Sequence, residues 1–203
     1  MLLRRSFRAW IVLALCASGC APVTSGAGRA EPVTEVEVSI DERYYEVEGV
    51  TPWDLNRALR TNGPRDDQAE RTWFGATDFA MRYRYEPMPW AEGCRAGAAR
   101  VEVELVTTLP EWPDREAAPA MLRADWDLFL SRLREHEQGH QRIAMVMGQE
   151  LLRGVEALRA TDCGTLRTEA RRLAMAFESA ADLEHRSWDL ETAHGLVAAG
   201  EGG

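Results

Sequence analysis

Residues 134–144 read "REHEQGHQRIA" and contain the pattern His-Glu-x-x-His at His136, Glu137 and His140. On an α-helix, residues four apart lie one above the other, so His136 and His140 can reach a single metal ion. Glu137 lies one step round the helix, where a carboxylate can take a proton from a water at that metal. The alternative is two unrelated histidines that happen to fall four residues apart. The surrounding sequence decides between these readings.

The residues around this pattern predict a long amphipathic helix over about residues 120–159. Apolar residues recur at steps of three and four, in one stripe with the pattern itself. The stripe consists of Trp126, Leu130, Leu133, Glu137, His140, Ala144, Met147 and Leu151. Such a stripe faces a core, so the histidines are expected on or beside the buried side. Gly139 and Gly148 have low helix propensity, which leaves open a bend or break near either.

Two further helices are predicted. The first covers about residues 51–64, because Thr51 is a suitable N-cap, Pro52 suits the first helical position and Asn62-Gly63-Pro64 is a stop signal. The second runs from about residue 165 to residue 192. Its expected buried side holds Leu173, Phe177, Ala180 and Leu183.

Strands are predicted in the first half of the folded region. Alternating apolar residues over 36–40 and 45–47 indicate two half-buried strands, with a hairpin turn at 41–43. Residues 72–87 and 100–110 also have strand character. The expected fold class is therefore α+β, with a small, mainly antiparallel sheet packed on the long helix and on a C-terminal helix.

The N-terminus has the features of an export signal. "MLLRRSFRAWIVLALCASGC" has a basic start, an apolar run and small residues before Cys20, and is too short to serve as a spanning helix. "ASGC" resembles a bacterial lipobox, which predicts that residues 1–19 are a lipoprotein signal peptide and that Cys20 is lipidated. A plain signal peptide cut near Ala30 is the alternative. Residues 20–34 are small and rich in Gly, Pro, Ser and Thr, which predicts a flexible tether before one folded domain over residues 35–200.

The net charge of the chain argues against some classes of binding partner. The 203 residues carry a formal net charge of −9, and removal of residues 1–19 takes away three arginines and no acid, which gives −12. A surface this acidic repels nucleic acid and anionic lipid headgroups. We therefore expect no nucleic-acid partner, and membrane association through the lipid anchor only, in a bacterial cell envelope and facing the periplasm.

Two cysteines remain in the predicted folded domain, Cys94 and Cys163. In an oxidising compartment two such residues are most simply one disulfide. Two buried free thiols are the alternative. Neither cysteine lies in a close pair, which argues against a thiolate zinc site.

A catalytic zinc ion is held by three protein groups and keeps a fourth position open. The first pattern supplies two ligands, and the densest group of further candidates lies in "HRSWDLETAHG" at residues 185–195. These candidates are His185, Asp189, Glu191 and His194. All four histidines of the chain lie in these two stretches, which favours two helices that face each other across one metal.

The chain resembles a bacterial family of domains of unknown function described as predicted secreted zinc-dependent proteases. The resemblance rests on the order of "YYEVEGVTPWDLNRALRTNGP", "LPEW", "HEQGH", the second cysteine and "DLETAHG". It implies a zincin-like fold with site residues at His136, Glu137 and His140, and a further group in the last stretch. Trp188 stands where we expect that family to have a tyrosine, which puts a phenolic role there in doubt.

His194 and Asp189 match the histidine and aspartate of the family's last motif. His194 is the favoured third ligand because neutral imidazole is the commoner zinc partner. Asp189 is the alternative, either as the ligand or as a group that orients one.

These features predict a cell-envelope zinc metallopeptidase that hydrolyses peptides or proteins, with Glu137 as general base on a zinc-activated water. The substrate is expected to lie along an exposed sheet edge as an added strand. One alternative is a non-catalytic zinc-containing binding or scaffold lipoprotein, in which His136, His140, Asp189 and His194 all bind the metal. A metal-free helical interaction module is a third, weaker possibility.

Overall fold

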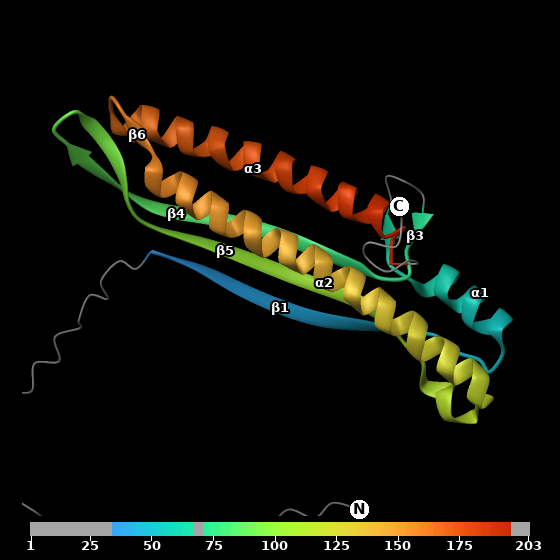
Figure 1. Cartoon of the computed structure of the whole chain (residues 1–203). Helices are drawn as coiled ribbons and strands as arrows, with labels where there is room; N and C mark the ends of the chain where they lie inside the picture. Colours follow the sequence, from blue (N-terminus) through green and yellow to red (C-terminus); the bar gives the residue numbers. More distant parts are fainter. Residues whose placement is uncertain (1–33, 67–70, 196–203) are drawn as a thin grey trace, which may run out of the picture. The chain divides into compact units, whose positions relative to one another are not determined.

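The computed structural model describes residues 34–66 and 71–195, and the predicted signal peptide, Cys20 and nearly all of the tether lie outside this part. The described part is α+β, as expected (Figure 1). In chain order its elements are β1 (Glu35–Glu46), α1 (Pro52–Asn62), β2 (Arg65–Asp66), β3 (Arg71–Thr72), β4 (Ala76–Trp90), β5 (Gly93–Glu111), the 3-10 helix η1 (Pro113–Ala117), α2 (Ala120–Ala157), β6 (Arg159–Ala160) and α3 (Cys163–Glu191).

The main sheet is mixed, where a mainly antiparallel one was expected. Its order is β1-β5-β4, with β4 antiparallel and β1 parallel to the central strand β5, and with the short β6 paired to the start of β5. β2 and β3 form a separate two-stranded sheet.

The hairpin turn expected at residues 41–43 is wrong, because β1 is a single strand. It pairs with β5 in one parallel register, from Glu35 opposite Arg100 to Glu46 opposite Glu111. β1 is an edge strand of the sheet, and polar residues 41–43 are exposed there. An edge strand accepts such charged residues without a break in its pairing.

The helices α2 and α3 pack on one face of this sheet, and α2 lies along β5 with α3 beside it (Figure 1). The predicted inward face of β5, Val101, Val103 and Leu105, is confirmed and packs against Ala144 and Leu151 of α2. The other face is solvated and carries ion pairs between neighbouring strands, including Arg84–Glu102 and Arg82–Glu104.

α2 continues through both of its suspect glycines, so no break occurs at Gly139 or Gly148. A Cβ at Gly148 would lie 2.6 Å from Cγ2 of Val103. Glycine at this position therefore lets the helix approach the central strand closely. The result is one uninterrupted helix that carries the histidine pattern over the sheet.

Near the first half of α2 a second core cluster joins α1 to the sheet. It contains Val47, Leu55, Leu59, Trp112, Ala118 and Trp126. The helix α1 has the predicted bounds, with Thr51 Oγ1 accepting a hydrogen bond from the Asp54 amide at 3.2 Å. This cluster fixes the part of α2 that precedes the histidines.

The predicted disulfide is present between Cys94 and Cys163. It joins the start of β5 to the first residue of α3, and so holds the N-terminal end of α3 against the sheet. One expected inward residue of α3, Leu183, is instead 64% exposed, because α3 packs mainly on α2 at the sheet edge. Within the described residues, no helix has the length and apolar character needed to cross a bilayer.

Candidate metal centre

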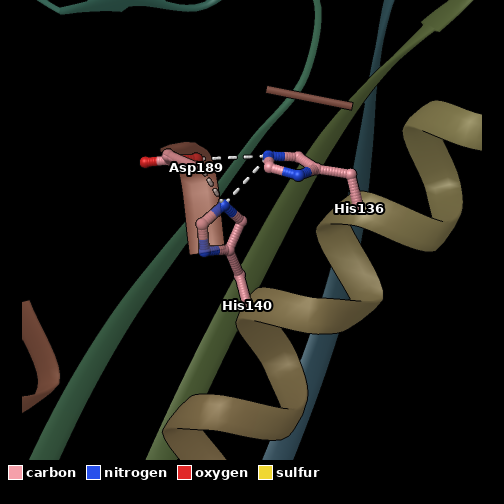
Figure 2. A group of neighbouring side chains, drawn as sticks. All are labelled: His136, His140 and Asp189. Carbon is pink, nitrogen blue, oxygen red and sulfur yellow. Dashed lines mark hydrogen bonds and ion pairs between the residues drawn. The ribbon is translucent and has the colours of Figure 1, made fainter. Parts of the chain in front are cut away.

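Three side chains from two helices converge beside the sheet. His136 and His140 extend from α2, and Asp189 extends from the last turns of α3 (Figure 2). The Nε2 atoms of the histidines lie 3.1 Å apart, and Asp189 Oδ1 lies 3.3 Å from Nε2 of His136 and 3.1 Å from Nε2 of His140. Tetrahedral zinc with bonds of about 2.0–2.1 Å separates its ligand atoms by about 3.3–3.4 Å. The donor types and their spacing therefore fit zinc.

A hydroxyl group at the C-terminal end of α3 determines which ring nitrogen of His136 carries the proton. Thr192 donates its only hydroxyl proton to the carbonyl oxygen of Trp188 at 2.7 Å. The same hydroxyl oxygen lies 2.7 Å from Nδ1 of His136, so it must accept there. We therefore assign the proton of His136 to Nδ1, which leaves the lone pair of Nε2 directed at the other two ligand atoms.

A further imidazole, that of His185, contacts His140. Nδ1 of His185 lies 2.8 Å from Nδ1 of His140, and the ring of His185 stacks on Phe79. Burial and then the neighbouring His140 lower the pKa of His185 to about 4, so this imidazole is neutral near pH 7. Its Nε2 is buried and has no hydrogen-bond partner in the described part of the chain. With Nδ1–H of His140 donating to His185, Nε2 of His140 is free to bind a metal.

Asp189, the alternative third ligand, takes the position that His194 was expected to fill. Burial acts to raise the pKa of Asp189, but the two α2 histidines beside it hold that pKa below its usual range, so the group is a carboxylate. His194 follows the end of α3, where Ala193 and His194 have φ of 44° and 55°. Its Nδ1 lies 3.3 Å from Oδ1 of Asp189, and its ring packs on Trp73. His194 thus contacts Asp189 from outside the group of three.

Glu137 is buried next to these ligands but is not one of them. Its carboxylate accepts a hydrogen bond from Thr77 Oγ1 on β4 at 2.8 Å. Burial raises the pKa of Glu137, and the Thr77 hydrogen bond opposes this only in part. A Cβ at Gly75 would lie 2.7 Å from Oε1 of Glu137, so the chain just before β4 passes directly over the carboxylate.

The three candidate ligands, Glu137 and His194 border one open cavity of about 250 Å³. One side of it is formed by the two helices, and the other by residues 73–79 before and within β4. Its lining combines the candidate ligands, Glu137 and His194 with aromatic side chains, Trp73, Phe74 and Phe79. A small polar centre inside an apolar wall is the usual composition of a binding or catalytic pocket.

Trp188 has a structural position, where the resemblance would place a tyrosine. Its Nε1 donates to the carbonyl oxygen of His136 at 2.9 Å, and its indole lies directly on Gly139. A side chain on Gly139 would overlap the indole. Trp188 therefore sets the distance between α2 and α3 at the level of the metal centre, and it is absent from the described lining of the cavity.

Two partners of the site escaped the sequence analysis. Thr192 lies inside the "DLETAHG" stretch, so its place three residues after Asp189 was an available signal, and the structure shows it buried. Thr77 gave no signal, since a threonine in a strand is ordinary. Of the other candidates, Glu191 is exposed and hydrogen-bonds Ser187.

Comparisons with known proteins identify a family for the sequence but give no activity. A family model for bacterial proteins of unknown function (DUF922) matches residues 42–195. Neither the curated proteins nor the solved structures contain a match. The matched region starts within β1 and includes every residue of the candidate metal centre.

Proposed function

The chain belongs to this bacterial family of unknown function, and we propose that it is a zinc-dependent metallopeptidase of the cell envelope with a zincin-like arrangement. One observation carries the proposal. Three ligand atoms at zinc-like spacing, from His136, His140 and Asp189, share a cavity with a buried carboxylate that is not a ligand, Glu137. A purely structural zinc site has no use for that extra carboxylate.

The number of ligands also supports catalysis. The described residues offer three ligand atoms within one group, and structural zinc sites generally have four protein ligands. A fourth position is thereby left to water or substrate. The scaffold alternative would require His194 to move from its contact with Asp189 into the group.

A zinc ion in this position would polarise a substrate carbonyl and lower the pKa of water to about 7. The chain itself moves the protons. Glu137 takes a proton from the attacking water and delivers it to the leaving amine. Its burial supports this role, because a raised pKa brings a carboxylate closer to the operating pH. Thr77 orients the carboxylate through its hydrogen bond.

We place the substrate along β4. Among the described residues this strand pairs with β5 alone, so its other edge offers unpaired backbone groups. Its first residues border the cavity, next to Glu137. An extended peptide added to this edge would carry its backbone past the metal centre.

The envelope location rests on the sequence before the described residues. Processing at the lipobox would leave Cys20 as the lipidated first residue, with the tether joining it to the domain. Lipoproteins of this kind carry more than one acyl chain, which makes the anchoring stable.

The test uses the mature chain from residue 20 with casein or a mixed peptide library. We expect cleavage that is lost on chelation and restored by zinc. A zinc-loaded protein that cuts nothing would contradict the proposal, and so would cleavage that survives complete removal of the metal.

A further inference from the structure

A second cavity lies between β4 and α3, next to the candidate metal centre. Its volume is about 600 Å³, within the range of ligand-binding pockets. The surface contributed by β4 and α2 is apolar and consists of Phe79, Ala80, Met81, Tyr83 and Leu151. We call this cavity the β4–α3 groove.

The groove adjoins the metal-centre cavity, because Phe79 lines both. On α3 its lining residues are spaced mostly at three and four, so one side of the helix follows the strand: Arg171, Ala174, Met175, Phe177, Glu178 and Asp182. Met175 is 67% exposed, so its side chain is accessible to a ligand in the groove. The groove thus lies next to the metal-centre cavity, along β4.

We propose that the groove receives alternate apolar side chains of an extended peptide bound as an added strand on β4, with the bond to be cut in the metal-centre cavity. This inference rests on the proposed peptidase function. Phe79, Met81 and Tyr83 are spaced two residues apart, about 6.6–6.8 Å along a strand. Side chains of an added strand that point the same way have the same spacing, so two or three of them would enter the groove.

The charges at the groove rim narrow the substrate class. Glu178 and Asp182 line the α3 side, and among the described residues neither forms an ion pair, whereas Arg171 lines the same side about two turns farther from Asp189. These carboxylates repel acidic peptides. The substrates are therefore peptides with bulky apolar residues at every second position and neutral or basic residues between them.

The experiment measures binding without cleavage, in the mature chain carrying Glu137→Gln. The probe is a short fluorescent peptide with leucine at alternate positions and serine or lysine between them. A second peptide has serine in place of the leucines. Fluorescence anisotropy gives the dissociation constants, and the parent protein is tested separately for cleavage of the first peptide.

Ala174→Leu fills the groove, and Ala176→Leu makes the same change at an exposed position of α3 outside the groove lining. We expect Ala174→Leu to weaken binding by about tenfold or more, since burial of even one leucine has an effect of this size. Ala176→Leu should bind like the parent. The serine peptide should bind as weakly as the leucine peptide binds to Ala174→Leu.

If Ala174→Leu does not fold, a second pair of variants is measured in the same assay. Met175→Glu places a charge in the groove, and Met121→Glu places one at an exposed methionine of α2. Equal affinity of both members of a pair for the leucine peptide would overturn the inference. Groove-dependent binding of a peptide that the parent never cuts would support the groove and contradict the peptidase.

Discussion

Nδ1 of His185 lies 2.8 Å from Nδ1 of His140, so when Nε2 of His140 binds a metal, its Nδ1–H donates to His185. The type of acceptor is unusual, because a metal-binding histidine commonly donates to a carboxylate or a carbonyl. Here a neutral imidazole is the acceptor, and its other nitrogen is buried without a partner in the described chain.

Replacing this acceptor should weaken zinc binding. His185→Phe keeps a ring on Phe79 but removes the acceptor, so zinc affinity should fall by about 10–100-fold. His185→Asn is the matched control, because its amide oxygen can still accept from His140. Competition with a chelator of known affinity measures both. Equal zinc affinity for the Phe and Asn variants would remove the positioning role of His185.

The third ligand can be tested with one pair of variants. Asp189→Ala should lose zinc, because Asp189 supplies one of the three ligand atoms. His194→Ala should keep about one zinc per chain, since His194 contacts Asp189 from outside the group. Elemental analysis after dialysis measures both. Loss of zinc from His194→Ala, with retention in Asp189→Ala, would reverse the assignment.

Gly139 should tolerate no side chain, because Trp188 lies on it. Gly139→Ala should lower the free energy of unfolding by about 1–3 kcal/mol through overpacking, although alanine is the better helix former. Gly154→Ala is the control on the same helix, since its Cβ would meet the end of the flexible Leu173 side chain at 3.0 Å and Phe177 at an ordinary contact distance of 3.5 Å. Urea denaturation measures both. Combining Gly139→Ala with Trp188→Leu should restore much of the loss.

The disulfide should make a large contribution to stability. Cys94 and Cys163 are 69 residues apart, and restricting a loop of that length in the unfolded chain contributes about 4 kcal/mol in the chain-entropy model. The double variant Cys94→Ser, Cys163→Ser should therefore unfold at clearly lower urea concentration than the oxidised parent. The reduced parent should behave like the double variant. An unchanged midpoint after reduction would contradict this contribution.

Local signals predicted the helices well. The N-cap at Thr51 and the stop at Gly63 define α1, and the apolar stripe of α2 placed His136 and His140 on its buried side. These features depend on residues close in the sequence, so a pattern can reveal them. The same holds for the inward face of β5.

The parts that were missed depend on contacts between distant residues. Polar residues 41–43 are compatible with a turn or with an exposed edge strand, and only pairing with β5 decides between them. Asp189 and His194 lie in one short stretch, and the left-handed backbone at Ala193 and His194 places the histidine beside Asp189, outside the group of three ligand atoms. Neither residue is a glycine, so the sequence gives little warning of that turn.

The central claim is that Glu137 moves protons at a zinc ion that His136, His140 and Asp189 hold. Its most direct test combines zinc content and peptide cleavage in Glu137→Gln, with His140→Ala as the variant that should lose the metal. The account predicts about one zinc per chain in Glu137→Gln and a fall in cleavage of at least about 100-fold. Cleavage by Glu137→Gln at the parent rate, with its zinc in place, would contradict the account.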